Sequence, residues 1–205
     1  MARPLDATAR RGELLDGAFA LFAARGYHAL STRDLARELG VTTGALYHWF
    51  AGKPELFVAM LERQVARQVA EALAAVAPHG PEARMAALGA HLRANMDDLQ
   101  RTLLVSLDYH RAHPDGGSPL AGALAAYRDA LVLQIGLPAE NAGLVVSLVL
   151  GELLQRALDA THAGADLATT LPALAALASG RASDRASDYG SANAAADAPA
   201  TRPPQ

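Results

Sequence analysis

The sequence predicts an all-α protein of about nine helices, and three observations lead to that fold class. Apolar residues recur every three or four positions along most of the chain, which is the period of an amphipathic helix. Beyond Phe57 no stretch alternates apolar and polar residues as a half-buried strand does. Glycine or proline follows most of the apolar stripes, where helices commonly end. With 205 residues, of which 51% are hydrophobic, the chain is long enough for one or two small domains with a substantial core.

The composition limits which partners and compartments suit the chain. Because it contains no cysteine, disulfides and thiolate metal sites are excluded, and a reducing cytoplasm fits that absence. The N-terminus, MARPLDATARRG, contains no apolar segment of signal-peptide length, and the apolar stretch from Leu144 to Leu154 is too short to span a bilayer. We therefore expect a soluble cytoplasmic protein. Its net charge of −3 means that any contact with DNA has to depend on local charge.

Three helices are predicted within residues 1–57. The first carries an apolar stripe formed by Leu14, Leu15, Ala18, Leu21 and Phe22. Ser31 or Thr32 can cap the second helix, whose inward positions are Leu35, Ala36 and Leu39. Gly40 follows, where a chain leaving a helix often needs a positive φ, and Thr42 or Thr43 can cap the third helix. The turn between the second and third helices is therefore about three residues long.

The third helix has a polar and aromatic outer face. Leu46 and Phe50, one turn apart, face inward, and the residues left outside are Thr42, Thr43, Gly44, Tyr47, His48 and Trp49. Such a face suits the major groove of DNA, because backbone N–H groups and hydroxyls bind phosphates while other side chains reach base edges. Two amphipathic helices joined by a glycine turn also occur in proteins that never touch DNA, and the aromatic residues would then belong to the core.

The residues around this turn carry a more specific pattern. It reads A-x-x-LF-x-x-x-GY, then TRDLA-x-x-LGV, then LYHWF-x-x-K-x-x-LF, and over about residues 10–57 it closely resembles the tetracycline-repressor (TetR) family of bacterial transcription regulators. In that family the first three helices form the DNA-binding domain, and a long fourth helix links it to a regulatory domain. The resemblance implies operator contacts by Thr32, Arg33, Thr42, Thr43, Gly44, Tyr47, His48, Trp49 and Lys53. It implies a scaffold role for Leu35, Ala36, Gly40, Val41, Leu46 and Phe50.

Lys53 is the only lysine in the chain, against seventeen arginines. Its compact ammonium group on a flexible stem suits a single phosphate, whereas arginine favours a planar bidentate partner. The alternative is a solvated lysine near the start of a helix.

Beyond Phe57 the apolar stripes predict six further helices. The fourth helix begins near Pro54 and runs to about Val76, before a break at residues 78–81. The next stripes consist of Met85, Leu88, Leu92, Met96 and Leu99, then Leu103, Leu104, Leu107 and Arg111, then Leu120, Leu124, Tyr127, Leu131 and Ile135. The eighth helix, at about 139–162, is apolar nearly all round from Leu144 to Leu150, so it has to be buried on two sides.

This eighth helix and a ninth at 166–179 predict a homodimer. One side of the eighth helix can pack on its own domain and the other on a second copy, giving a four-helix bundle across a two-fold axis. The resemblance implies the same arrangement. Two recognition helices would then meet successive major grooves about 34 Å apart, which predicts a palindromic operator. The alternative is that the eighth helix is the central buried helix of a monomer.

We divide the chain into a helix-turn-helix DNA-binding domain at 1–57, a helical ligand-binding and dimerisation domain at 58–180, and a disordered tail at 181–205. The tail begins with two RASD copies and holds almost no large apolar side chain. Candidate ligand residues, which place polar groups beside apolar stripes, are His91, Asn95, Tyr109, His110 and Tyr127. Each is equally compatible with a core or boundary role. His110, His113 and Asp108 lack a further ligand, so no metal and no cofactor are predicted.

The function predicted is a ligand-responsive, homodimeric transcription repressor released from its operator by a small, largely apolar effector. Repression rather than activation is implied by the resemblance alone. No phosphate-binding glycine loop, G-x-S-x-G elbow or dinucleotide fingerprint is present, so an enzyme, for instance a helical-bundle catalyst using Glu152, is the weaker class. A helical adaptor dimer that binds protein through its N-terminal domain is the remaining alternative.

Overall fold

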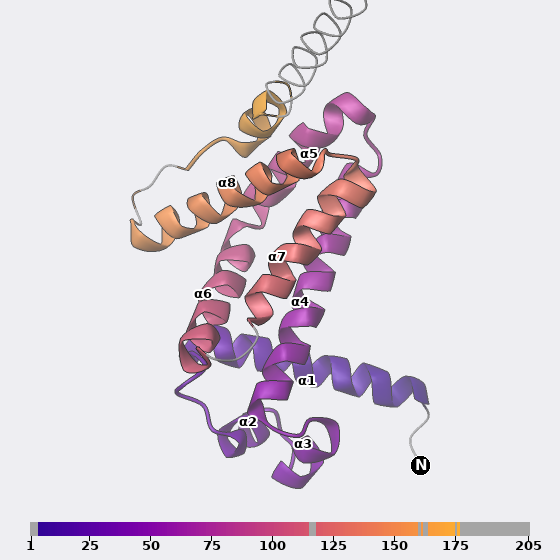
Figure 1. Cartoon of the computed structure of the whole chain (residues 1–205). Coiled ribbons are helices and arrows are strands. Elements are labelled where there is room, and N and C mark those ends of the chain that lie inside the picture. Colours follow the sequence, from indigo (N-terminus) through magenta and orange to yellow (C-terminus); the bar gives the residue numbers. More distant parts are fainter. Residues whose placement is uncertain (1–3, 115–117, 160, 162–163, 175, 177–205) are drawn as a thin grey trace, which may run out of the picture.

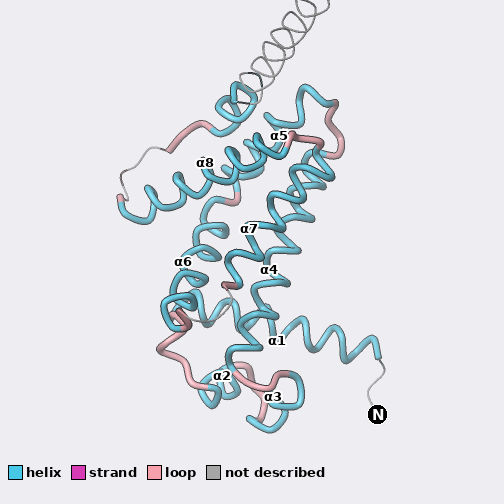
Figure 2. The backbone as a smooth tube through the Cα atoms, viewed as in Figure 1, coloured by secondary structure: helices cyan, strands magenta, loops and turns pink. Residues whose placement is uncertain are grey.

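The computed structural model describes residues 4–114, 118–159, 161, 164–174 and 176 of the chain. Within these residues all regular structure is helical, as Figure 2 shows, and this confirms the predicted fold class. The helices in chain order are α1 (Pro4–Arg25), α2 (Thr32–Glu38), α3 (Thr43–Trp49), α4 (Lys53–Val76), α5 (Pro81–Ala94), α6 (Met96–Ala112), α7 (Pro119–Ala130), a π-helical turn η1 (Leu131–Ile135) and α8 (Ala139–Leu158). Residues 167–174 are also helical.

The first three helices gather at one end of the molecule, and α4 runs from them toward α5 at the other end (Figure 1). Helix α1 packs across α4, while α6 and α7 lie along it. Helix α8 contacts α6 and α7. The long α4 is therefore the element that joins the two ends of the protein.

Two hydrophobic clusters meet along α4. The first contains the inward faces of α1, α2 and α3, the first half of α4 as far as Val65, and Val105, Tyr109 and Ala123 from α6 and α7. The second contains residues of α5 to α8 together with Val76, and it includes Leu167 and Leu171 from the C-terminal helix. Because the first cluster extends past residue 57, α4 belongs to both ends, and the boundary between 1–57 and 58–180 stays a prediction.

The predicted stripe from Met85 to Leu99 is divided by the structure. Helix α5 ends at Ala94, and α6 begins at Met96 with Asn95 between them at φ −110° and ψ 17°. The Asn95 side chain donates a hydrogen bond to the backbone oxygen of His91 at 2.8 Å, and the same oxygen also accepts the Asn95 N–H at 3.1 Å. The prediction placed this break about four residues too late, because the apolar spacing continues in phase across it.

The ends of the remaining elements also depart slightly from the prediction. The stripe from Leu120 to Ile135 is one α-helix followed by the π-helical turn, which Gly136 ends at φ +85°. Helix α8 ends at Leu158 rather than near residue 162. The predicted helix at 166–179 is helical at 167–174 and 176, and its other residues beyond 174 lie outside the described part. The predicted disordered tail at 181–205 lies outside it as well.

Helix α8 is buried on one side within a single chain. Asn141, Val145, Glu152 and Leu153 face the interior, whereas a row of leucines faces outward. The exposed fractions of these leucines are 55% at Leu144, 43% at Leu154 and 88% at Leu158. By length and composition α8 is also apolar enough to cross a membrane, but its packing against α6 and α7 and its buried glutamate are those of a globular core helix.

Candidate nucleic-acid interface and ligand cavity

The turn between α2 and α3 is fixed by hydrogen bonds that the local sequence makes. Ser31, rather than Thr32, caps α2 and forms a reciprocal capping box with Asp34. At the other end Gly40 adopts φ +68°, and its N–H donates to the Arg37 oxygen while the N–H of Val41 donates to the Ala36 oxygen. These two bonds form a Schellman motif, which requires a left-handed residue at the glycine position. The angle between α2 and α3 therefore follows from this short segment.

Helix α3 presents its polar face to solvent. Leu46 and Phe50 are 2% exposed, and with Leu35 and Ala36 of α2 they hold the helix on the core. The side chain of Tyr47 is 52% exposed, and Thr42, Gly44 and His48 are exposed as well. Helix α3 is thus anchored on one face and open on the other.

Some predicted contact residues also serve the fold. The Thr42 hydroxyl oxygen accepts the N–H of Ala45 at 3.1 Å as the N-cap of α3, which leaves its hydroxyl hydrogen free to donate outward. Trp49 is half-buried and packs against the first hydrophobic cluster, with its ring edge-on to His48. Thr32 and Thr43 are half-buried. The exposed centre of the face is therefore Gly44, Tyr47 and His48.

The charges beside this face are mostly paired within the protein. Arg37 bridges Asp34 and Glu38, and Arg25 also reaches Glu38 at 3.2 Å. The hydrogen bonds from Ser31 lower the pKa of Asp34, and those from the two arginines lower the pKa of Glu38. Arg33 is exposed, and the described residues provide it with no ion pair. Its guanidinium is the cation of α2 that is left to meet an external anion.

Lys53 lies at the start of α4 and is bound to the loop between α1 and α2. Its ammonium group donates to the Tyr27 oxygen at 3.0 Å and to the Leu30 oxygen at 2.9 Å, and it lies 3.9 Å from the centre of the Tyr27 ring. Burial lowers the pKa of Lys53, and the nearby Asp108 carboxylate opposes this shift. Two of the three ammonium hydrogens are used by the carbonyls, which leaves one for a phosphate. The phosphate contact stays a prediction, while the structural contact was not foreseen.

Helix α6 meets the same loop from the other side. The Asp108 carboxylate accepts the backbone N–H of Tyr27 at 2.5 Å. Tyr109 stacks on Phe57 with ring centres 4.3 Å apart and meets Tyr27 edge-on at 4.9 Å. His113 stacks on the other side of Tyr109. This joint connects the far end of α6 to the N-terminal three-helix unit, and sequence reasoning missed it because Asp108 carries no local pattern.

Two candidate ligand residues are corrected by this placement. Tyr109 lies in the first hydrophobic cluster, because its position near the end of α6 directs it to Tyr27 of the α1–α2 loop and Phe57 of α4. His110, one residue later, faces solvent. Neither lines the cavity described below. Among the described residues no group of three or more histidine or acidic side chains could hold a metal ion.

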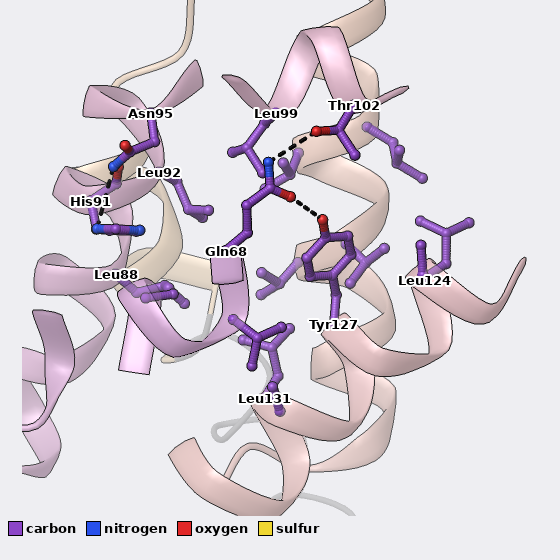
Figure 3. Close-up of a pocket in the computed structure, with 18 of the residues that line it drawn as sticks. Gln68, Leu88, His91, Leu92, Asn95, Leu99, Thr102, Leu124, Tyr127 and Leu131 are labelled. Carbon is purple, nitrogen blue, oxygen red and sulfur yellow. Dashed lines mark hydrogen bonds between the residues drawn. The ribbon is translucent and has the colours of Figure 1, made fainter. Parts of the chain in front are cut away.

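A cavity of about 110 Å³ lies between α4, α5, α6, α7 and α8 (Figure 3). Its wall is mainly leucine, valine and isoleucine, and the candidates His91, Asn95 and Tyr127 are among the residues that line it, while their role in ligand binding stays a prediction. Sequence reasoning missed three further polar residues of the wall, Gln68, Glu71 and Thr102. The signal for the first was present, since Gln64 and Gln68 occupy buried positions one turn apart on α4 where apolar residues are expected.

Three polar residues of the wall, Gln68, Thr102 and Tyr127, form one connected network. The Tyr127 hydroxyl donates to Oε1 of Gln68. Nε2 of Gln68 donates to the Thr102 hydroxyl at 3.0 Å and to the Asp98 carboxylate at 2.9 Å, and Arg67 reaches the same carboxylate at 3.0 Å. Burial raises the pKa of Tyr127, so its phenol stays neutral. Helices α4, α6 and α7 are thereby linked at the cavity wall.

Comparisons with known proteins agree with this geometry. A family model described as bacterial regulatory proteins of the tetR family matches residues 14–60. The HTH-type transcriptional repressor KstR2 of Mycobacterium tuberculosis is 53% identical over 47 residues, covering 23% of this chain and 24% of the relative. The HTH-type transcriptional activator FasR of Mycolicibacterium smegmatis is 45% identical over 56 residues, covering 27% of this chain and 26% of the relative. The chain thus matches about a quarter of the length of these curated relatives.

Solved structures extend the likeness to the whole fold. A TetR-family member from Streptomyces coelicolor has a TM-score of 0.66 at 21% identity, covering 80% of this chain and 97% of that one. A TetR-family regulator from Mesorhizobium loti has a TM-score of 0.63 at 16% identity, with 83% and 95% covered. At these identities the likeness concerns the fold alone. The strong sequence match stays confined to the N-terminal helices and the start of α4.

Proposed function

Because this chain belongs to the TetR family of bacterial regulatory proteins, we propose that it is a cytoplasmic, homodimeric transcription repressor whose operator binding responds to a small, largely apolar ligand. The observation that carries the proposal is the orientation of α3, which is held on the core by Leu46 and Phe50 and leaves Tyr47 and His48 open to solvent. A helix fixed on one face and polar on the other can enter a major groove without unfolding anything. An enzyme would leave this face without a use.

The proposed DNA-binding domain is 1–57, followed by a ligand-binding and dimerisation domain at 58–180 that shares α4 with it. The proposed operator contacts divide into two kinds. Gly44, Tyr47 and His48 are exposed on α3 and would reach bases or phosphates in the groove. Arg33, the Thr42 hydroxyl and the third Lys53 hydrogen would bind phosphates, with Thr32, Thr43 and Trp49 at the edges of the contact.

The proposed dimer uses the outward leucines of α8. Leu144, Leu154 and Leu158 lie on one side of this helix, with the small residues Ser147 and Gly151 between them. A row of exposed leucines on a polar protein surface marks an association surface. A second copy related by a two-fold axis would cover it with the same face, with the 167–174 helix alongside, and such a dimer requires a palindromic operator.

The ligand would act by selecting one of two arrangements of α4 and α6. Both helices line the cavity, and both bind the loop that carries Tyr27, α4 through Lys53 and α6 through Asp108. An occupied cavity that moves one helix along the other therefore shifts the DNA-binding unit. In a dimer this changes the distance between the two α3 helices, so that they no longer fit successive grooves.

The proposal is tested by selecting bound fragments from random DNA with the purified full chain and measuring affinity against salt. We expect log affinity to fall linearly with log salt, with a palindromic consensus. Tyr47→Ala should weaken binding to the selected site by about 1–3 kcal/mol if its contact is well formed. His110→Ala is the matched control, because His110 is also exposed but lies on α6. Failure to bind any DNA at low ionic strength would sink the proposal.

The sign of regulation needs a separate experiment, because FasR is an activator and KstR2 a repressor. A reporter gene placed behind the selected site should be expressed less when the protein is present. Increased expression would make the protein an activator with the same DNA interface.

A further inference from the structure

The cavity wall has no uncompensated charge. Among the described lining residues Glu71 is the one carboxylate, and it pairs with Arg67 at 3.0 Å on the partly exposed rim. Asp98, just behind the wall, accepts hydrogen bonds from Arg67, Gln64 and Gln68. With the His91 imidazole neutral, a charged ligand in this cavity would lose its hydration and gain no counter-ion. The occupant is therefore neutral.

The polar network at one side of the cavity has spare acceptors but no spare donors. The donor hydrogens of Tyr127 and Gln68 are already used in hydrogen bonds within the protein. The Tyr127 hydroxyl donates to Gln68, and the Gln68 amide donates to Asp98 and Thr102. The Thr102 hydroxyl in turn donates to the backbone oxygen of Asp98 at 2.9 Å. Oε1 of Gln68 and the oxygen of Tyr127 each keep a lone pair. A ligand group at this place has to donate a hydrogen.

The orientation of the Gln68 amide is fixed by its neighbours. Its nitrogen faces the Asp98 carboxylate, which accepts only, so its oxygen has to face Tyr127. Figure 3 shows Gln68 between Thr102 and Tyr127. His91 and Asn95 lie together at the left of the view, away from Thr102 and Tyr127. The acceptor site is thus a defined place on the wall, with Leu99, Leu124 and other apolar side chains around it.

The size of the cavity limits the occupant further. An apolar cavity of about 150 Å³ in another protein admits benzene. At about 110 Å³, this cavity accepts a molecule of similar size with small movements of its leucine side chains. A much larger molecule requires the helices to separate.

We propose that the cavity binds a neutral molecule, about the size of one six-membered ring, whose hydroxyl group donates a hydrogen bond to the Gln68–Tyr127 pair. The proposal deepens the proposed function, on which it rests for the statement that this molecule is the effector. The binding itself does not depend on DNA and can be measured without it.

The test is calorimetric titration of the full chain with benzyl alcohol, benzaldehyde, ethylbenzene and benzoate. The first three have the same number of non-hydrogen atoms. Benzyl alcohol offers a hydrogen-bond donor, benzaldehyde offers only an acceptor, and ethylbenzene offers neither. We expect benzyl alcohol to bind about 10-fold more tightly than the other two, the value of one hydrogen bond of about 1.4 kcal/mol. Benzoate should not bind measurably. Equal affinities for the three neutral probes, tighter binding of benzoate, or no binding of any probe at millimolar concentration would overturn the proposal.

Two variants make the test independent of a folding defect. Gln68→Met removes the acceptor and frees the Tyr127 hydroxyl to donate, so benzyl alcohol and benzaldehyde, which both accept, should now bind about equally, and both more tightly than ethylbenzene. Tyr127→Phe leaves Oε1 of Gln68 without its donor, so the preference for benzyl alcohol over ethylbenzene should persist or increase. Tyr109→Phe is the control, because it removes another buried tyrosine hydroxyl away from the cavity. An unchanged probe order in folded Gln68→Met contradicts the assignment.

The outcomes separate this inference from the proposed function. Selective binding of benzyl alcohol by a chain that binds no DNA would support the cavity assignment and sink the regulator. Operator binding by a chain that binds none of the probes would support the regulator and refute the cavity assignment. Benzyl alcohol that binds the cavity and also weakens operator binding supports both.

Discussion

Replacing Lys53 with methionine tests whether this residue stabilises the protein as the structure indicates. The ammonium group donates to two backbone oxygens at 3.0 and 2.9 Å and lies 3.9 Å from the Tyr27 ring centre. Hydrogen bonds from a charged donor contribute about 1.5–3 kcal/mol each, and a cation–π contact at a partly exposed site about 0.5–1 kcal/mol. The half-buried ammonium is also costly to desolvate, which offsets part of this sum. We expect Lys53→Met to lower the free energy of unfolding by about 2 kcal/mol.

The measurement is urea unfolding of the full chain, monitored by circular dichroism. The variant and the parent protein are compared at equal concentration, because dimerisation would contribute to stability. For a chain of this length the expected loss corresponds to a melting temperature lower by about 4–8 °C. Arg101→Met serves as control, since it removes a positive charge from an exposed position on α6. An unchanged urea midpoint in Lys53→Met would refute the structural role argued for the two carbonyl contacts.

The same variant separates the two proposed roles of the lysine. If its third hydrogen also binds a phosphate, the slope of log affinity against log salt falls by about 0.9 per subunit. A loss of stability with an unchanged slope would mean that Lys53 serves the protein alone, and the phosphate contact would then be removed from the interface.

Three further substitutions test other parts of the molecule. At Gly89 an added Cβ would lie 2.2 Å from a backbone oxygen of the neighbouring C-terminal helix, so Gly89→Ala should lower the free energy of unfolding in urea by about 1–3 kcal/mol. Gly122→Ala is the control, because Gly122 has open space around it and an alanine there should be neutral or stabilising. The hydrogen bond from Arg63 lowers the pKa of Asp16 in the folded protein. The ionised carboxylate therefore stabilises the fold at pH values above the pKa of Asp16 in the unfolded chain, and this stabilisation is lost as the pH falls through the pKa of Asp16 in the folded protein. Asp16→Asn should therefore flatten the acid limb of the stability curve, by less than about 1 kcal/mol because both side chains are half-exposed, and an equally steep limb would contradict this reading. Asp108→Asn weakens the acceptor of the Tyr27 N–H. It should reduce the effect of bound ligand on operator affinity more than it reduces ligand affinity itself. Equal losses in the DNA titration and the ligand titration would refute the coupling role of Asp108.

The parts of the fold that were predicted from sequence are those that local chemistry decides. The unit formed by α2, the turn and α3 depends on Ser31, Gly40 and Thr42, each of which acts within five residues of its own position. Pro54 and the break after Val76 likewise mark the ends of α4. Capping residues and glycines therefore located these elements to within a residue or two.

The parts that were missed depend on contacts between distant segments. Tyr109 and Tyr127 both lie beside apolar stripes, yet the first contacts the α1–α2 loop and α4 and the second lines the cavity. The sequence does not contain the rotation of α6 about its axis, which decides between these two environments. The boundary at Asn95 was missed for a different reason, because the same apolar period continues through it while a side-chain hydrogen bond ends α5.

The joint at Tyr27 links the cavity to the proposed DNA-binding unit through two helices at once. Lys53 of α4 binds the backbone oxygen of Tyr27, and Asp108 of α6 binds its N–H. The same two helices are also connected at the cavity, where Gln68 of α4 binds Thr102 of α6. Along their axes these contacts are separated by about 22 Å on α4 and about 9 Å on α6. If an occupied cavity moves α4 along α6, that movement cannot keep both bonds to the single residue Tyr27, so the loop would follow one helix or the other. The joint would then have two discrete arrangements, which is the physical condition for an effector to switch operator binding rather than weaken it gradually.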